Sequence, residues 1–183
     1  MKLNFKPILF VVGCLMMTGS YAQKVIIENN KVIVDASALR NSTKVKKARG
    51  TDGTATTLGT NDATNIGSEV SDEKVYYKFE VDKEDKGYNF FWLDAVHTCQ
   101  TLTKDGGGWR TPTKRELLLM YLLKQELEAY SGFDKLESRY WSATESEAEK
   151  SWAIYLYSVH NRGQLNAEPK TYYANVRCIR DLD

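Results

Sequence analysis

The sequence has few of the residues that enzymes and metal sites most often use. Its 183 residues include only two histidines, His97 and His160, which lie far apart with no second ligand at metal spacing. It also lacks a Gly-x-Ser-x-Gly nucleophile turn, a phosphate-binding glycine loop and a zinc signature. We therefore expect no catalytic residue, no bound metal and no cofactor.

An excess of charge of one sign is also missing. The chain has 25 basic and 24 acidic residues, which gives a formal net charge of +1. Proteins that attract nucleic acid or anionic lipid by electrostatics carry a basic excess, so we expect no nucleic-acid partner. Beyond residue 22 no apolar run is long enough to span a bilayer.

The longest apolar run stands at the N-terminus and indicates export. Two lysines precede the apolar stretch Ile8–Met17, and Ser20-Tyr21-Ala22 offers small residues for cleavage before Gln23. This order is typical of a secretory signal, which we assign to residues 1–22. The protein is then expected in the periplasm, at the cell surface or in the medium.

An alternative for the same segment is a lipoprotein signal. Val11-Val12-Gly13-Cys14 has the small residue before cysteine at which bacterial lipoproteins are lipidated and cut. The apolar run continues past the cysteine through Leu15–Met17, which favours the secretory interpretation. Attachment to a membrane is expected only if Cys14 is lipidated.

Cysteine is scarce, and only Cys99 and Cys178 follow the signal segment. An even number of cysteines suits an oxidising compartment. If the two pair, the bridge closes a loop of about 80 residues and stabilises the fold by roughly 4–5 kcal/mol before native strain is subtracted. Two buried free thiols are the alternative. A catalytic cysteine beside His97 is disfavoured, because residues two apart on a helix point to different faces.

Composition divides the rest of the chain into three parts. Residues 23–38 contain two short apolar runs around the turn Glu28-Asn29-Asn30-Lys31, which indicates a β-hairpin. Residues 39–69 are basic at first and then rich in Thr, Gly, Asn, Ala and Asp, which is typical of a flexible linker. Residues 70–183 carry the patterns of a folded domain.

Periodicity predicts the elements of that domain. Val75 to Val81 alternates as a half-buried strand, and the helix that begins near Phe90 places Cys99 on its apolar face. A second helix is predicted from Pro112 at the first helical position, with a capping box at Thr113-Lys114-Arg115-Glu116. The later strands are predicted at Tyr140–Ala143, Trp152–Tyr157 and Tyr172–Ile179. One strand, two helices and then several strands indicate an α+β fold with a mainly antiparallel sheet.

Four short signatures follow one another in the last part of the chain. They are WLDAVHTCQTL (Trp92–Leu102), GGGWRTPTKREL (Gly106–Leu117), YWSATE (Tyr140–Glu145) and VRCIRDL (Val176–Leu182). Their order and spacing resemble the Legionella-collagen-like C-terminal domain family, a domain of unknown function. Variants with RELLLMY and YWSATE resemble the C-terminal domains of exported Bacteroidetes proteins, some of them fimbrial tip adhesins. The resemblance covers about residues 88–182.

This resemblance implies a C-type-lectin-like domain. In that fold the first helix is tied to the last strand by a disulfide, which implies the pair Cys99–Cys178. Calcium-dependent lectins of this fold carry Glu-Pro-Asn or Gln-Pro-Asp and a Trp-Asn-Asp triplet. Here the chain has Glu168-Pro169-Lys170 and lacks the triplet, so we interpret Glu168-Pro169 as a loop turn and expect binding without calcium.

Aromatic and polar residues on or near the late strands are the candidate binding residues. Tyrosines with nearby amides suit the recognition of sugar or protein. The candidates are Tyr155, Tyr157, His160, Asn161, Arg162 and Tyr172, with Tyr173 and Asn175 beside them. The alternative is that about half of them are core or ordinary strand residues. The acidic stretch Glu145, Glu147 and Glu149 is interpreted as a solvated loop.

These observations favour a non-enzymatic recognition or adhesion module that is exported and binds a glycan or protein on a surface. A structural subunit of an assembly such as a fimbria is one alternative. A cryptic enzyme is the other, because sulfatase-modifying enzymes share a related fold. Those enzymes use a reactive cysteine pair, so a core disulfide between Cys99 and Cys178 would leave no group for that chemistry.

Overall fold

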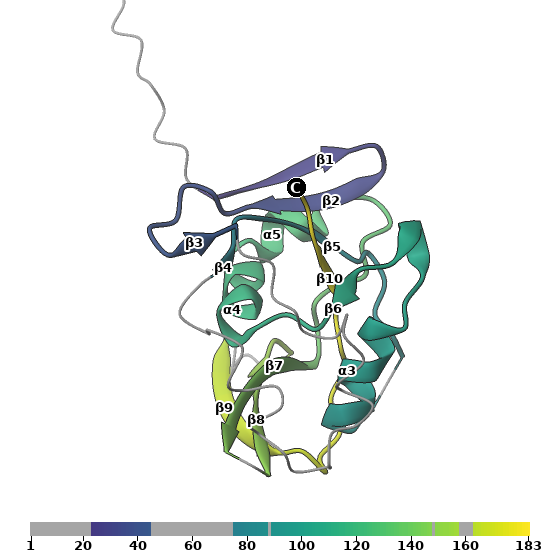
Figure 1. The fold of residues 1–183 in the computed structure, drawn as a ribbon, viewed down its shortest axis with the longest axis vertical. Helices are drawn as coiled ribbons and strands as arrows, with labels where there is room; N and C mark the ends of the chain where they lie inside the picture. Colours follow the sequence, from purple (N-terminus) through teal and green to yellow (C-terminus); the bar gives the residue numbers. More distant parts are fainter. Residues whose placement is uncertain (1–22, 45–74, 88, 148, 158–162) are drawn as a thin grey trace, which may run out of the picture.

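The structure of the chain is a computed structural model that describes residues 23–44, 75–87, 89–147, 149–157 and 163–183 (Figure 1). The predicted signal segment, which includes Cys14, and most of the predicted linker lie outside these residues. The candidate binding residues His160, Asn161 and Arg162 also lie outside them.

The described chain forms an α+β fold with mainly antiparallel sheets, as the sequence predicts. The main sheet has the order β1-β2-β5-β10-β6, made of β1 (Lys24–Glu28), β2 (Lys31–Asp35), β5 (Lys78–Val81), β10 (Ile179–Asp181) and β6 (Trp109–Arg110). A second sheet, at the lower end of Figure 1, contains β7 (Arg139–Glu147), β8 (Lys150–Tyr155) and β9 (Gln164–Pro169). A short parallel pair joins β3 (Ser42–Thr43) to β4 (Val75–Tyr76).

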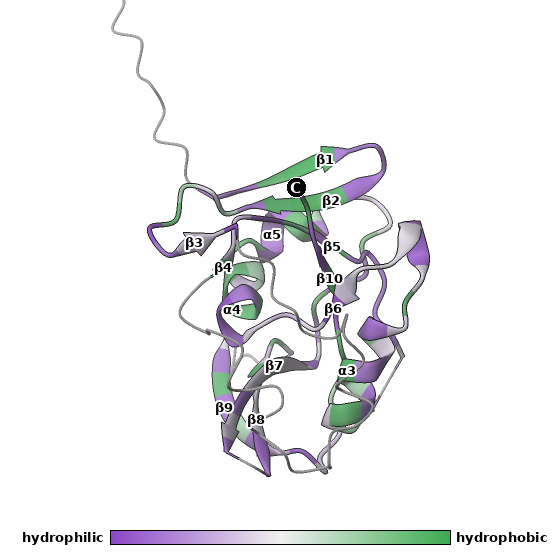
Figure 2. Ribbon diagram, viewed as in Figure 1, coloured by the Kyte–Doolittle hydropathy of each residue, from purple (hydrophilic) through white to green (hydrophobic). Residues whose placement is uncertain are grey.

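The helices lie between and beside these sheets (Figure 1). They are α3 (Trp92–Gln100), the 3-10 turn η2 (Lys104–Gly106), α4 (Lys114–Leu122) and α5 (Lys124–Glu128). One core cluster packs the apolar residues of β2, β5 and β4 against α4 and α5. A second cluster packs α3 against Trp109, Trp141 and Cys178. Figure 2 shows hydrophobic colouring along β1 and β2 and on α3.

The N-terminal hairpin is part of the main sheet. β1 pairs with β2 from Lys24 opposite Asp35 to Glu28 opposite Lys31, and the turn residues Asn29 and Asn30 have φ angles of 49° and 62°. Asparagine is one of the few residues that adopt this left-handed conformation readily, as the two-residue hairpin turn requires. The other edge of β2 pairs with β5, so the hairpin extends the domain sheet. The first residues of the predicted linker also belong to the fold, because they form β3.

The capping box at the start of α4 is confirmed, but the first helical residue is Lys114, two positions later than the predicted Pro112. The Thr113 hydroxyl accepts a hydrogen bond from the Glu116 N–H (3.3 Å), and the Glu116 carboxylate accepts one from the Thr113 N–H (2.8 Å). These bonds make Thr113 the N-cap. Pro112 therefore precedes the cap and does not occupy the first helical position.

Two late segments differ from the sequence prediction. The predicted strand Tyr172–Ile179 is mostly irregular, because Ala174 bridges Phe90 and Asn175 bridges Tyr140 before β10 begins at Ile179. The segment changes partner at almost every residue, so no ladder can propagate. The sequence did not predict strand β9 (Gln164–Pro169), and the interpretation of Glu168-Pro169 as a loop turn is wrong, because these two residues end that strand. Its sequence QLNAEP has low β propensity and a proline, which an edge strand tolerates.

Candidate functional site

The candidate surface is built around Tyr155 at the end of β8. Tyr155, one of the candidate binding residues, is only 9% exposed, so most of it packs inside the domain. Its hydroxyl donates to Glu168 Oε1 (2.6 Å) and accepts from Arg139 Nη1 (3.0 Å). Burial, followed by the hydrogen bond to Glu168, raises the pKa of Tyr155. The residue therefore anchors Arg139 and Glu168 at the rim of the sheet.

Strand pairing explains this arrangement. Arg139 on β7 lies opposite Tyr155 on β8, and Tyr155 lies opposite Gln164 on β9. Directly paired residues point to the same face of a sheet, and alternate residues along a strand share that face. Gln164, Asn166 and Glu168 therefore form a polar row, in which Gln164 Nε2 donates to Asn166 Oδ1 (3.0 Å).

Exposed tyrosines lie on the segments that follow β8 and β9. Tyr157 is 56% exposed, and its ring centroid lies 5.9 Å from that of Tyr155. Tyr172 and Tyr173 are each 50% exposed, and Tyr173 stacks on Phe91 with ring centroids 4.6 Å apart. Tyr157 and Tyr172, two of the candidate binding residues, are therefore open to solvent. Asn175 is buried, and its N–H donates to the Arg139 carbonyl (2.8 Å), so it supports the sheet.

Arg139 connects the two groups of aromatic residues. One guanidinium nitrogen donates to the Tyr155 hydroxyl and another donates to the Tyr173 carbonyl. Its guanidinium carbon also lies 5.5 Å from the centre of the Tyr155 ring. We call the resulting surface the aromatic face, defined by Phe91, Arg139, Tyr155, Tyr157, Gln164, Asn166, Glu168, Tyr172 and Tyr173.

Sequence reasoning missed Phe91, Arg139 and the polar row of β9. Phe91 was assigned to the start of a helix, whereas its backbone is extended and the helix begins at Trp92. Alternation places Arg139 on the same strand face as the fully buried Trp141, so the sequence pattern gives no signal for a surface role. The residues of β9 could not have been found without assigning that strand.

Lys170, which directly follows Glu168-Pro169, lies in a buried ion pair. The ammonium of Lys170 pairs with the Glu145 carboxylate and lies 4.3 Å from the centre of the Trp92 ring. The side chains of Lys170 and Glu145 are only 4% and 2% exposed. The interpretation of Glu145 as part of a solvated loop is therefore wrong, because it lies on β7 and is buried in an ion pair. In the part of the chain that the structure describes, no three His, Cys, Asp or Glu side chains are grouped to hold a metal ion.

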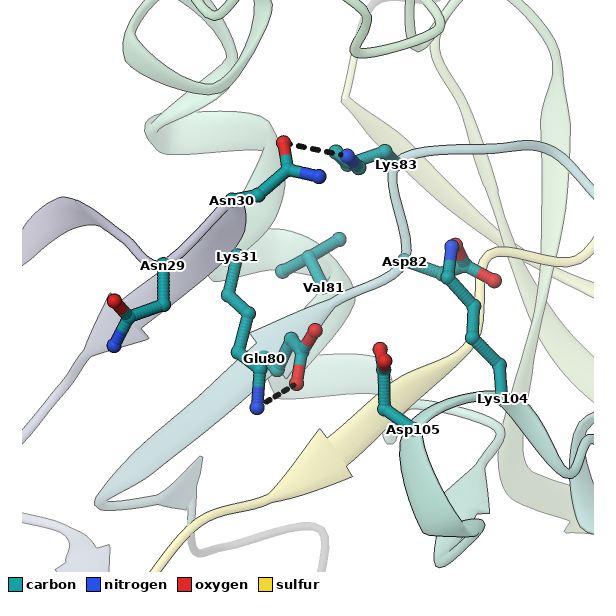
Figure 3. A pocket seen from close by; sticks show the side chains of 9 residues that line it. All are labelled: Asn29, Asn30, Lys31, Glu80, Val81, Asp82, Lys83, Lys104 and Asp105. Atoms are coloured by element: carbon teal, nitrogen blue, oxygen red, sulfur yellow. Dashed lines mark hydrogen bonds and ion pairs between the residues drawn. The ribbon is translucent and has the colours of Figure 1, made fainter.

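A polar cavity of about 110 Å³ lies away from the aromatic face, between the hairpin turn, the end of β5 and η2 (Figure 3). The charged side chains that line this cavity pair mostly with other residues that line it. Asp82 pairs with Lys104 (2.8 Å), Lys31 lies 4.0 Å from Glu80, and Lys83 donates to Asn30 (3.0 Å). The polar cavity therefore has no excess charge with which to select an ion.

A wider groove of about 600 Å³ runs along α4 and α5 beside Leu122 and Leu156.

Comparison with known proteins identifies the domain. Residues 42–180 match the family described as the Lcl C-terminal domain. The chain belongs to this family. The match confirms the resemblance seen in the sequence and extends it upstream to include β3, β4 and β5. No curated protein matches the chain.

The Lcl C-terminal domain is not a known enzyme family, and it is associated with extracellular proteins. Across the residues described by the structure, no helix combines the length and apolar character needed to cross a bilayer.

The signature residues of this Lcl C-terminal domain build its scaffold. Cys99 on α3 and Cys178 before β10 form a disulfide with Cα atoms 5.4 Å apart, and both are fully buried. The indole N–H of Trp92 donates to the Ser142 carbonyl (2.8 Å), and that of Trp141 donates to the Phe90 carbonyl (2.9 Å). These contacts fix α3 against β7 and thereby position Phe91 on the aromatic face.

The glycine-rich signature supplies a second anchor of the Lcl C-terminal domain. Arg110 forms two hydrogen bonds to Glu116 (2.7 and 2.9 Å) and two to Asp181 Oδ1 (2.6 and 3.1 Å). Burial alone would lower the pKa of Arg110. The carboxylates of Glu116 and Asp181 outweigh this effect and raise the pKa. Glu116 also accepts the N–H of Tyr76 (3.0 Å). One buried cluster therefore joins β4, β6, β10 and α4.

Proposed function

We propose that this protein is an exported, non-enzymatic recognition module whose aromatic face binds glycan chains at a surface without calcium. The observation that carries the proposal is the clustering of exposed aromatic rings. Six large hydrophobic side chains are exposed among the described residues, and four of them belong to the aromatic face: Phe91, Tyr157, Tyr172 and Tyr173. Exposed apolar residues scattered singly need no explanation, whereas a group of them marks an interaction site.

The chemistry around the rings favours a sugar as the ligand. An aromatic ring can cover the apolar C–H face of a sugar, while neighbouring polar groups bind its hydroxyls. The face supplies Gln164 and Asn166, which carry both donors and acceptors, and Glu168, which carries acceptors. Arg139 and Tyr155 hold Glu168 and the rings in place through hydrogen bonds.

Calcium is not needed for this mode of binding. Lys170 follows Glu168-Pro169 at the position where the calcium-dependent motif has an amide or acid, and its ammonium is paired with Glu145. A divalent cation placed beside that ammonium would be repelled. Recognition is therefore proposed to depend on stacking and hydrogen bonds alone.

Two other functions are less well supported. A sulfatase-modifying type of enzyme would need its cysteine pair reactive, and Cys99 and Cys178 are bonded to each other inside the core. A purely structural subunit would not require four exposed aromatic rings on one face. We therefore propose recognition as the main function, and a structural role in a larger assembly as the second candidate.

A glycan array that also carries extracellular-matrix proteins tests the proposal. The purified protein is expected to bind a restricted set of glycans equally well in calcium and in excess chelator. Binding only to matrix proteins would replace the glycan ligand by a protein ligand. Loss of binding in chelator, or no binding to any component, would contradict the proposal.

A further inference from the structure

Strand β1 presents an unprotected edge of the main sheet. It is the first strand in the order β1-β2-β5-β10-β6, and among the described strands only β2 pairs with it. Figure 1 shows β1 along the upper rim of the molecule. Natural edge strands usually carry a proline, a bulge or a central charge that prevents pairing with another chain. β1 reads KVIIE, with charges only at its ends and a regular register along its whole length.

The hairpin geometry fixes which backbone groups face outward. In a two-residue hairpin, the pair next to the turn is hydrogen-bonded within the hairpin, and bonded pairs alternate with non-bonded pairs from there. Glu28 pairs with Lys31 next to the turn, so Glu28, Ile26 and Lys24 direct their N–H and C=O groups toward β2. Val25 and Ile27 therefore direct theirs toward the open edge.

The sequence of β1 is complementary to itself in the antiparallel direction. When a second copy is centred on Ile26, the outward groups of Val25 meet those of Ile27 in the other copy. The same register places Lys24 opposite Glu28 of the second copy, and Glu28 opposite Lys24. These are non-hydrogen-bonded pairs, in which side chains approach most closely. A shift by one residue would remove both charge pairs and misalign the outward hydrogen-bonding groups.

We propose that two copies of this chain associate through β1, antiparallel and centred on Ile26, into one continuous sheet. The hairpin already places Lys24 opposite Asp35 and Glu28 opposite Lys31. The second copy extends this alternation, so each charge of β1 lies between two opposite charges. Ile27 is 46% exposed in the single chain and would be covered by Val25 of the second copy.

A charge-swap experiment tests this interface. Sedimentation velocity of the purified protein from about 10 µM to about 1 mM should show a monomer–dimer equilibrium. Lys24→Glu should weaken dimerisation about tenfold, because it places two carboxylates opposite each other twice in the dimer. Glu28→Lys should weaken it to the same extent by placing two ammonium groups together.

The double variant Lys24→Glu/Glu28→Lys is the matched control. It should restore dimerisation, because opposite charges face each other again across the interface. Each single variant also puts like charges together inside its own hairpin, opposite Asp35 or Lys31, and the double variant carries both of these effects. Recovery in the double variant therefore reports the contact between copies. A monomer at every concentration, or equal dimerisation by all four proteins, would overturn the proposal.

A backbone substitution provides an independent test. Ile27→Pro removes an outward N–H while leaving the hydrogen bonds within the hairpin, a position at which an edge strand tolerates proline. It should abolish the dimer while the melting temperature stays near that of the parent. Ile27→Ala keeps the N–H and should retain a weaker dimer. A proline variant that folds and dimerises as the parent does would exclude pairing through this edge.

Discussion

Phe91 and Tyr173 stack with ring centroids 4.6 Å apart, although 40% of Phe91 and 50% of Tyr173 remain exposed. The two residues come from segments far apart in sequence. Phe91 is the last residue before α3, and Tyr173 precedes the bridge between Ala174 and Phe90. The disulfide between Cys99 and Cys178 holds these same two segments together. The scaffold of the domain therefore positions two of the four exposed rings of the aromatic face.

Removal of the disulfide should destabilise the fold without removing the surface chemistry. The double variant Cys99→Ala/Cys178→Ala is expected to lose about 4–5 kcal/mol of unfolding free energy, because an open loop of 79 residues has more entropy in the unfolded chain. Denaturant unfolding measures this loss. Stability equal to that of the parent would show that the bridge contributes nothing to the native fold.

The buried carboxylate of Glu116 should contribute more to the stability of the fold than an exposed carboxylate does. Glu116→Gln leaves Arg110 without its two-point partner in the core and is expected to cost about 3–5 kcal/mol. The same change at Glu126, which is exposed on α5, should stay within about 0.5 kcal/mol. Chemical denaturation of both variants distinguishes them. Equal effects would contradict the role assigned to Glu116.

The ion pair of Asp82 and Lys104 should make stability depend on pH at both extremes. Burial alone would raise the pKa of Asp82, but hydrogen bonds from Lys104 and Lys86 outweigh it and lower that pKa below 3.8. Burial would lower the pKa of Lys104, but Asp82 raises it above 10.5. The stabilisation from Asp82 is thus present above pH 3.8 and is lost as pH falls through its folded pKa. The stabilisation from Lys104 is present below pH 10.5 and is lost as pH rises through its folded pKa.

The variant Asp82→Asn checks this pH dependence. It should lower the unfolding free energy by about 2 kcal/mol at neutral pH, because it removes charge-assisted hydrogen bonds. The difference from the parent should shrink below pH 3.8, where the parent carboxylate becomes protonated. A difference that stays constant from neutral to strongly acidic pH would show that the carboxylate charge is not responsible.

Arg139 should influence binding by positioning other residues. Arg139→Ala removes the bonds to the Tyr155 hydroxyl and the Tyr173 carbonyl, so both parts of the aromatic face lose their link. Binding of a glycan found on the array should weaken about tenfold. Arg139→Lys cannot make both bonds with the same planar geometry and should recover little of the loss. Full binding by Arg139→Ala would exclude this role.

Much of the scaffold could be predicted from the sequence because its signals are local. Helical spacing predicted that Cys99 faces the core, and the Thr113–Glu116 pair predicted the start of α4. Strand β9 gave no such signal. Its register depends on β8, which supplies the ladder that QLNAEP lacks the propensity to define alone.

The candidate site was predicted less well because it depends on tertiary contacts. Tyr157 and Tyr172 were selected for their residue type, and both lie in bends beyond the ends of β8 and β9, where tertiary packing decides their exposure. Tyr155 was selected on the same grounds and is buried. Phe91 joins the face only because Tyr173 reaches it from a distant segment. Neither the composition nor the periodicity of the sequence predicts that contact.

The most direct test of the central claim is the affinity of the array-selected glycan for variants of the exposed tyrosines. Isothermal titration should show binding weakened about tenfold or more by Tyr157→Ala and by Tyr172→Ala, with melting temperatures close to that of the parent. Leu122→Ala is the control, because Leu122 is 63% exposed but lies on α4 outside the aromatic face. The account predicts that this control binds as the parent does, in chelator as well as in calcium. Parental affinity in both tyrosine variants would contradict the assignment of recognition to this face.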